Sequence, residues 1–237
     1  MSATSDPRRP AGAAERGMHD QTRISDLCLA VALAVELAAR ASHSGERTIM
    51  GIVGPPGSGK STVAQKIIQA LGDDAVLVPM DGFHLAQEEL VRLGRRDRMG
   101  APDTFDVTGF ASLLGRLRRR DEDVVYAPRF DRSIELPIAG AIAIPRDVPL
   151  IITEGNYLLH DGEGWQALAP LLDTTWYVEV PRSLREERLM ARRIAHGDTP
   201  DHSAQWVRTV DARNAQTVER ARELADTVLE RGRGMTS

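Results

Sequence analysis

Residues 54–61 constrain the fold of this chain more than any other segment. Their sequence, GPPGSGKS, matches the P-loop pattern G-x-x-x-x-G-K-[ST] at every fixed position. A strand-like run, residues 48–53, precedes the motif, and a helix-like run, residues 61–71, follows it. Glycines in such a loop let several backbone N–H groups point at a phosphate, and the helix N-terminus adds partial positive charge. The motif therefore predicts a nucleoside triphosphate site on a strand–loop–helix unit.

Two side chains of the motif have expected roles of their own. Lys60 is expected to reach the β- and γ-phosphates, and the Ser61 hydroxyl is expected to bind Mg²⁺. The residues expected to contact the nucleotide are Gly54, Pro55, Pro56, Gly57, Ser58, Gly59, Lys60, Ser61 and Thr62.

Length and composition restrict the remaining possibilities. The 237 residues suffice for one α/β domain, and the net charge of −4 shows no global bias toward nucleic acid. Cys28 is the single cysteine, so an internal disulfide is excluded. The apolar run 27–39 is interrupted by Glu36 and is expected to be too short to span a bilayer. We therefore expect a cytoplasmic protein, with residues 1–20 as a disordered tail and residues 21–237 as a single domain.

Near-continuous apolar runs between helix-like segments predict a parallel sheet that is covered on both faces. The predicted strands after residues 48–53 are residues 75–80, 148–153 and 175–180, with residues 225–229 as a last edge strand. Residues 26–41 predict a helix that packs on the sheet and is a candidate interface for a homodimer. In such sheets ligands bind at the carboxyl ends of the strands.

Acidic residues follow two of these strands. Asp81 comes after residues 75–80 and could accept the proton of an attacking hydroxyl, whereas Gly82 would let the chain turn away sharply. Glu154 comes after residues 148–153, a layout that holds Mg²⁺ directly or through water. For both acids the alternative is a helix N-cap.

Further polar and aromatic residues are candidates for binding a small polar substrate. The loop 102–106 and the stretch 126–133 mix acidic, basic and aromatic groups; the alternatives are a solvated turn for the first and an edge strand with a turn for the second. Asn214 lies in the apolar stripe of a helix that begins at Thr199-Pro200, and its amide bonds either a ligand or backbone. The candidate substrate contacts are His84, Asp103, Phe105, Tyr126, Arg129, Asn156 and Asn214.

An arginine-rich helix is predicted near residue 183, where Ser183 and Glu186 have the spacing of a capping box. Arg185, Arg188, Arg192 and His196 would share one of its faces, with Arg193 beside it. Such a face can bind phosphoryl oxygens, so we predict a lid over residues 182–202; the alternative is a solvated helix. The basic run 116–120 is interpreted as a solvated helix end.

Five segments follow one another along the chain: the P-loop, Asp81-Gly82-Phe83-His84, residues 102–106, Glu154-Gly155-Asn156-Tyr157 and the arginine-rich stretch 185–193. In this order they resemble the phosphoribulokinase/uridine kinase family of P-loop kinases, which includes bacterial pantothenate kinase. The likeness covers about residues 48–230. It implies a P-loop NTPase fold, a three-layer α/β/α sandwich with a mainly parallel sheet and a short arginine-rich helical lid.

The resemblance also implies roles for individual residues. Asp81 matches the family's catalytic base, residues 126–132 lie where the acceptor is contacted, and Arg188, Arg192 and Arg193 resemble the lid arginines that close over ATP. Gly82 and His84 depart from the uridine kinase pattern, and the Asp-Gly-Phe sequence is more like that of pantothenate kinase. A nearer likeness is to nucleoside/nucleotide kinase-like members, some labelled as sugar kinases.

The sequence therefore predicts transfer of a phosphoryl group from Mg·ATP to a hydroxyl of a nucleoside, pantothenate or sugar. Asp81, Lys60, Arg188 and Arg192 are the expected catalytic residues, Arg193 is an expected ATP contact, and Ser61 with Glu154 would hold the metal. An acceptor-independent ATPase and a non-catalytic nucleotide sensor are the alternatives. The chain lacks the guanine-reading sequence Asn-Lys-x-Asp, which argues against a GTPase. Neither nucleic acid nor a membrane is an expected partner.

Overall fold

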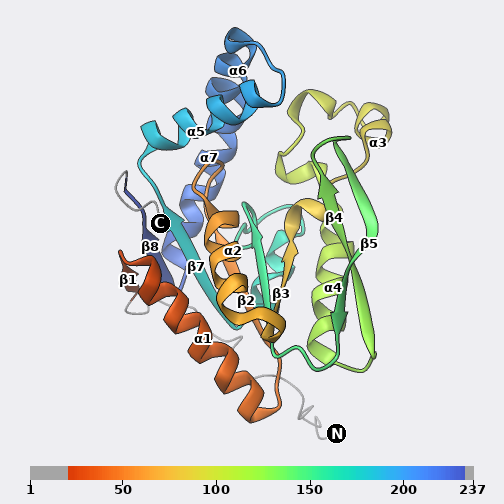
Figure 1. The fold of residues 1–237 in the computed structure, drawn as a ribbon. Helices are drawn as coiled ribbons and strands as arrows, with labels where there is room; N and C mark the ends of the chain where they lie inside the picture. The colour runs from red at the N-terminus through yellow and green to blue at the C-terminus, as the bar shows by residue number, and fades with distance from the viewer. Residues whose placement is uncertain (1–20, 233–237) are drawn as a thin grey trace, which may run out of the picture.

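The computed structural model describes residues 21–232, so the predicted disordered tail, residues 1–20, lies outside the described residues (Figure 1). Within that range one sheet has the strand order β1-β8-β7-β2-β6-β3, and every pairing in it is parallel. The strands are β1 Thr22–Ile24, β2 Thr48–Val53, β3 Ala75–Pro79, β6 Leu150–Gly155, β7 Thr174–Glu179 and β8 Thr227–Glu230. The predicted parallel sheet is confirmed.

One predicted strand has a different place in the sheet. Residues 225–229 were expected at an edge, but β8 lies between β7 and β1. The edge strand is β1, which pairs with β8 from Thr22↔Thr227 to Ile24↔Leu229. The prediction was wrong because the short sequence Thr-Arg-Ile of β1 carries no apolar run that would mark a strand.

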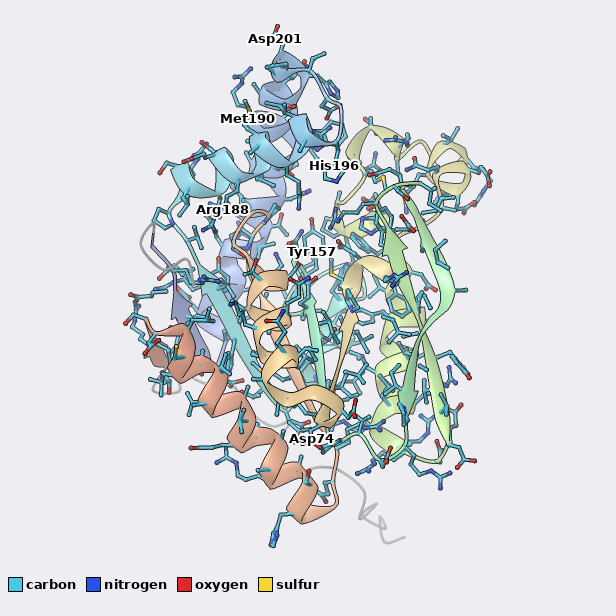
Figure 2. All side chains as sticks on the ribbon, in the orientation of Figure 1. Asp74, Tyr157, Arg188, Met190, His196 and Asp201 are labelled. Carbon is cyan, nitrogen blue, oxygen red and sulfur yellow. The ribbon has the colours of Figure 1, made fainter. Side chains whose placement is uncertain are left out.

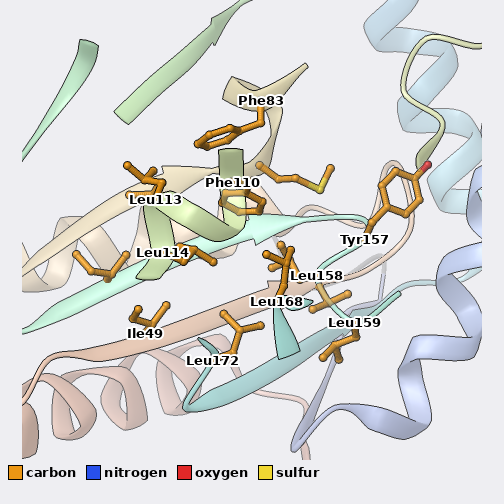
Figure 3. Packing of buried hydrophobic residues seen from close by; sticks show 14 of the residues in the cluster. Ile49, Phe83, Phe110, Leu113, Leu114, Tyr157, Leu158, Leu159, Leu168 and Leu172 are labelled. Atoms are coloured by element: carbon orange, nitrogen blue, oxygen red, sulfur yellow. The ribbon is translucent and has the colours of Figure 1, made fainter. Parts of the chain in front are cut away.

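Helices cover both faces of the sheet, which makes three layers (Figure 1). On one face, α1 Leu27–Ser44 packs against α2 Lys60–Leu71 and the sheet through a stripe of small buried residues, Ala30, Ala34, Ala38 and Ala41. The other face packs against α4 Val107–Arg119, whose Phe110, Leu113 and Leu114 lie in the apolar cluster of Figure 3. The fold class predicted from the sequence is therefore confirmed.

Helix α1 is longer than its apolar run indicated. Asp26 caps it through a bond to the Cys28 amide of 2.8 Å, and it continues to Ser44. By length and composition alone these 18 residues could cross a membrane, contrary to the expectation from residues 27–39. Its buried alanine stripe packs against α2 and the sheet, and a single such helix is weak evidence for a membrane span.

A long antiparallel hairpin stands beside the sheet, and its second strand was not predicted. It consists of β4 Val124–Asp131 and β5 Leu136–Pro145, with an irregular register between Ala127 and Arg129. A short helix, α3 Gln87–Arg92, lies near the hairpin tip (Figure 1). The hairpin corresponds to the edge strand and turn that was the alternative for residues 126–133.

The predicted lid is helical and stands over the carboxyl end of the sheet (Figure 1). It contains α5 Arg182–Ala195 and α6 Pro200–Trp206; a π-helical turn, Val207–Asp211, and α7 Ala212–Glu219 continue the chain. Thr199 caps α6, as predicted. The capping box of α5 was wrong, because the helix begins at Arg182 with Pro181 as N-cap, and Ser183 therefore lies inside the first turn.

Candidate active site

The P-loop has a conformation that only its glycines permit. Gly57 and Gly59 have φ angles of 77° and 89°. A Cβ atom on Gly54 would lie 2.8 Å from Ser58 Oγ, and one on Gly57 would lie 2.7 Å from the Arg185 carbonyl oxygen of α5. The loop is thus pressed against the lid helix, and α2 begins directly after it at Lys60.

The loop fits a bound phosphate. Ser58 Oγ is buried and has no hydrogen-bond partner among the described residues. Ser58 is fully buried, so the loop faces a ligand through Gly57 and Lys60, which line the cavity beside it. Pro55 contributes its carbonyl oxygen to the loop, Pro56 borders the cavity, and Thr62 is exposed on α2.

Lys60 lies at the centre of the loop. Its Nζ donates to the carbonyl oxygens of Gly54, at 2.9 Å, and Pro55, at 3.2 Å, and to Oδ1 of Asn156 at 2.8 Å. Burial lowers the pKa of Lys60 to about 8, and the nearby Glu154 carboxylate opposes that shift. The side chain is therefore held beside the phosphate position from both the loop and the end of β6.

Ser61 and Glu154 supply oxygen ligands next to the loop. Ser61 Oγ donates to Glu154 Oε1 at 3.1 Å. Glu154 pairs with Ile52 of β2 on one side and with Pro79 of β3 on the other, so the sheet places it between the P-loop and Asp81. Burial raises the pKa of Glu154, and the Lys60 ammonium opposes the rise. Because Glu154 is inside β6, the helix-cap alternative is excluded.

These two residues fit Mg²⁺. No group of three or more His, Cys, Asp or Glu side chains that could hold a metal occurs within residues 21–232. Mg²⁺ in nucleotide sites commonly takes one or two protein oxygens and fills its remaining positions with water and phosphate. A hydroxyl beside one carboxylate is therefore a suitable donor set.

Asp81 follows β3 in a short 3-10 turn, Met80–Phe83. Its Oδ2 accepts from Arg132 Nη2 at 2.8 Å. It does not cap the next helix, since Ala86 is the N-cap of α3 and makes no side-chain bond there. Gly82 is required for a different reason than the predicted sharp turn: a Cβ atom on it would lie 2.4 Å from the Pro128 carbonyl oxygen of β4.

A cavity of about 630 Å³ joins these groups to the hairpin, the loop before α4 and the lid. His196 of the lid, labelled in Figure 2, is among the residues that line this cavity. The predicted site residues that line the cavity are Pro56, Gly57, Lys60, Ser61, Asp81, His84, Phe105, Glu154, Asn156, Arg192, Arg193 and Asn214.

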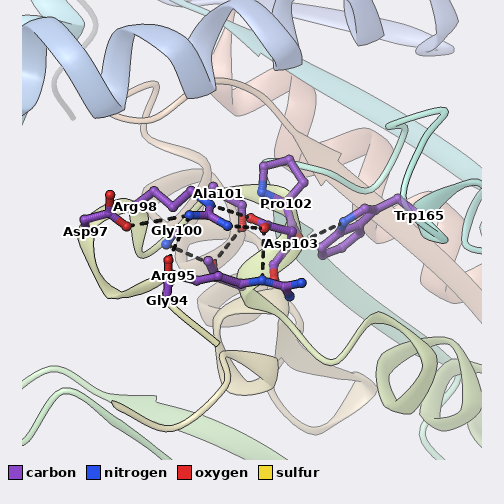
Figure 4. A network of polar contacts seen from close by, with 10 residues as sticks. Gly94, Arg95, Asp97, Arg98, Gly100, Ala101, Pro102, Asp103 and Trp165 are labelled. Atoms are coloured by element: carbon purple, nitrogen blue, oxygen red, sulfur yellow. Dashed lines mark hydrogen bonds and ion pairs between the residues drawn. The ribbon is translucent and has the colours of Figure 1, made fainter. Parts of the chain in front are cut away.

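Three candidate substrate contacts lie outside this cavity. Asp103 forms ion pairs with Arg98 at 2.9 Å and Arg95 at 3.2 Å, and it anchors the polar network of Figure 4. Tyr126 is 59% exposed on the outer face of the hairpin, and Arg129 is exposed as well. Strand alternation explains the position of Tyr126, because Val125 and Ala127 point into the core. The exposure of Arg129 follows from the irregular register between Ala127 and Arg129, which breaks the alternation.

His84 and Asn214 border the cavity while bonding to the protein. His84 Nδ1 donates to the Asp81 carbonyl oxygen at 2.9 Å. Its ring lies between those of Phe105 and Phe130, at centroid distances of 4.0 and 4.8 Å. Asn214 Nδ2 donates to the Gly100 carbonyl oxygen at 3.3 Å, so the backbone alternative for this amide is confirmed, although the side chain still faces the cavity.

The lid arginines divide into separate tasks. Arg188 Nη1 donates to the Gly57 carbonyl oxygen at 3.4 Å, so this side chain lies against the P-loop (Figure 2). Arg185 is buried and pairs with Glu219 at 3.0 Å. Arg193 pairs with Asp198 and lies over the Trp206 ring, 4.7 Å from its centroid. Arg192 lines the cavity, where burial and the Arg132 guanidinium lower its pKa.

Sequence reasoning did not select Arg132 or Asp211 as site residues. Arg132 belongs to the mixed stretch 126–133, where its charge was one signal among several. Asp211 ends the π-helical turn, and burial raises its pKa to about 6 against the opposing charge of Arg192. The basic run 116–120 ends α4, as predicted, and Arg116, Arg118 and Arg119 form ion pairs with nearby acids.

Known proteins resemble the chain over most of its length. No protein-family model matches it. The "Putative uridine kinase C227.14" of Schizosaccharomyces pombe is 32% identical over 196 residues, which are 78% of this chain and 83% of that protein. The "Uncharacterized protein YggC" of Escherichia coli is 34% identical over 189 residues, 78% of each chain. A solved structure, the "putative fructose transport system kinase" from Silicibacter sp. TM1040, matches with a TM-score of 0.75 at 36% identity and covers 86% of this chain and 99% of its own.

Proposed function

Because the chain belongs to the phosphoribulokinase/uridine kinase family of P-loop kinases, we propose that it transfers the γ-phosphoryl group of Mg·ATP to a hydroxyl group of a small metabolite. The observation that carries the proposal is the shared cavity. It brings a carboxylate, Asp81, to the same space as the phosphate-binding Lys60 and the lid arginine Arg192.

The residues of the cavity divide the work of phosphoryl transfer. Lys60 and the loop amides bind the phosphates, and Arg192 offsets the charge that develops on the transferring group. Ser61 and Glu154 would hold Mg²⁺, which neutralises phosphate charge when it is bound. Asp81 takes the proton of the acceptor hydroxyl while the acceptor oxygen bonds to the γ-phosphorus and the bond from that phosphorus to ADP breaks.

The lid supports this reaction by excluding water. Arg188 joins α5 to the P-loop through its contact with the Gly57 carbonyl oxygen. Arg193, Asp198 and Trp206 hold the far end of the lid together. A water-poor site strengthens the attraction between Arg192 and a phosphoryl oxygen and limits hydrolysis of ATP.

The names of similar proteins support two acceptor classes. The fission yeast relative is named a uridine kinase, and the bacterial structure is named for a fructose transport system. We retain nucleoside, pantothenate and sugar as acceptor classes. A cytoplasmic location, independence of nucleic acid and a homodimeric state stay predictions from the sequence.

The test is ADP release from Mg·ATP with uridine, cytidine, pantothenate, fructose and ribulose 5-phosphate as separate acceptors. Stimulation by one acceptor, absent in Lys60→Ala, is the expected result and identifies the acceptor class. ADP release that no acceptor changes would replace the proposal with an ATPase. Tight ATP binding without any release would replace it with a nucleotide sensor.

A further inference from the structure

The hairpin and the Asp81 segment are packed together without a gap. Gly82 faces the Pro128 carbonyl of β4 so closely that no side chain fits between them. Phe130 of β4 stacks on His84, and the His84 ring nitrogen holds the Asp81 carbonyl. The hairpin therefore contacts the segment that carries the candidate base at two residues that follow Asp81, Gly82 and His84.

One side chain of the hairpin reaches the carboxylate itself. Arg132, the first residue after β4, donates from Nη2 to Asp81 Oδ2 at 2.8 Å. The neighbouring acid, Asp131, does not compete for it, because its Oδ1 accepts from the Ser133 amide at 2.9 Å and from the Ser133 hydroxyl at 2.6 Å. Arg132 also lies over the Phe130 ring, 6.0 Å from its centroid, which restricts its motion.

We propose that Arg132 is the positioning residue for Asp81, an inference that rests on the proposed phosphoryl transfer. The ion pair occupies Oδ2 and leaves Oδ1, which has no hydrogen-bond partner among the described residues, for the acceptor hydroxyl. The acceptor proton passes to Oδ1 as the acceptor oxygen bonds to the γ-phosphorus and ADP leaves. Arg132 does not exchange a proton in this step; it fixes which oxygen of the carboxylate faces the acceptor.

The charges around Arg132 favour this role over direct binding of the transferred group. Lys60 and Arg192 already supply cations at the phosphate side of the cavity, and the guanidinium of Arg132 disfavours the charged form of Arg192. The carboxylate of Asp81 is the acid with which Arg132 forms an ion pair. Because Arg132 is paired with Asp81, its guanidinium can orient the Asp81 carboxylate but does not follow the transferred phosphoryl group.

The proposal is tested with Arg132→Ala and Arg132→Lys, using whichever acceptor of the panel gives the fastest ADP release by the unmodified protein. For Arg132→Ala we expect kcat to fall about 100-fold, the scale of a slightly misplaced catalytic group, with KM for acceptor and for ATP changed little. Arg132→Lys should retain an intermediate kcat. Added guanidinium should restore part of the kcat of Arg132→Ala and none of that of Asp81→Asn. Arg40→Ala, an exposed arginine of α1 outside the cavity, is the control.

Other outcomes would overturn the proposal. A raised KM for the acceptor with kcat unchanged would make Arg132 a substrate-binding residue. A lost kcat without guanidinium rescue, together with a lowered unfolding temperature, would make its role structural.

A second measurement separates this inference from the proposed function. Unfolding temperatures of Arg132→Ala, Asp81→Asn and the double variant form a cycle that needs no catalysis. We expect the decreases in unfolding temperature of the two single variants to sum to about 1–3 °C more than the decrease of the double variant. This is the size expected for an ion pair at a partly exposed site. If the unmodified protein phosphorylates nothing, the proposed function fails, whereas strictly additive shifts would show that the ion pair itself is absent.

Discussion

At the scale of single residues, Gly82 decides whether the hairpin can reach the base. We expect Gly82→Ala to lower kcat at least 10-fold, because its Cβ would meet the Pro128 carbonyl oxygen at 2.4 Å and separate Arg132 from Asp81. Overpacking of this kind typically costs about 1–3 kcal/mol in the free energy of unfolding. Steady-state kinetics and thermal unfolding check both effects. The matched control is Gly115→Ala in α4, where the nearest atom is an arginine tip at 3.8 Å and alanine should stabilise the helix.

Asp81 is the second residue whose replacement separates chemistry from binding. Asp81→Asn keeps the shape of the side chain but removes the proton acceptor, so kcat should fall about 10²- to 10⁴-fold. The ATP dissociation constant should change little, because the phosphates are bound by Lys60 and by the amides of the loop that precedes α2. Kinetics and calorimetric titration with ATP measure the two quantities. Full turnover by this variant would remove Asp81 from the mechanism.

At the scale of elements, the π-helical turn at Val207–Asp211 places a buried acid beside the lid. Burial raises the pKa of Asp211 to about 6, although the Arg192 and Arg193 guanidiniums oppose the shift. The unfolded chain releases this proton near pH 4. The native state therefore gains stability from the protonated form below pH 4 and loses it as pH rises toward 6.

The substitution Asp211→Asn removes this loss of stability, because an amide does not release the proton. Above pH 6 we expect the variant to unfold at a higher temperature than the unmodified protein, which corresponds to a gain of about 1–2 kcal/mol at most in the free energy of unfolding. The difference should shrink as pH falls to 4. Thermal unfolding between pH 4 and 8 measures it. Asp201→Asn, at an exposed position of α6 (Figure 2), is the matched control. An equal effect of both substitutions would mean that Asp211 titrates as a surface acid.

The elements also show what could be predicted from the sequence and why. Strands β2, β3, β6 and β7 are apolar runs buried on both faces, so their ends, and with them Lys60, Asp81 and Glu154, were predictable. The hairpin was not, because β5 mixes exposed and half-buried apolar residues without strict alternation. The capping box at Ser183 failed because β7 ends at Glu179 and the helix starts directly after Pro181, so Ser183 is already inside the first turn.

At the scale of the whole molecule, the cavity depends on segments that lie far apart in the sequence. The P-loop, the end of β3, the hairpin and the lid meet only at the carboxyl end of the sheet. Asp103 illustrates the limit of a motif: its loop matches the family pattern, yet two arginines of the same loop turn its carboxylate away from the cavity. Which side of a loop faces the ligand is decided by such pairings, and spacing along the sequence does not contain them.

The opposite end of the sheet depends on one buried arginine. Arg47, just before β2, donates to four carbonyl oxygens, those of Leu117, Pro145, Arg146 and Val148, at 2.7–2.9 Å. Burial lowers its pKa to about 10. The bonds join the start of the sheet to the end of α4 and to the base of the hairpin.

We expect Arg47→Met to lower the free energy of unfolding by about 3 kcal/mol, because the replacement fills the space but leaves those carbonyl groups without a donor. Arg40→Met, an exposed change of the same size on α1, should have little effect. Urea unfolding compares the two. Since Arg47 lies away from the cavity, the folded variant should keep the KM values of the unmodified protein. A changed KM with unchanged stability would mean that this end of the sheet controls the position of the hairpin, and through it Asp81, more than it holds the fold together.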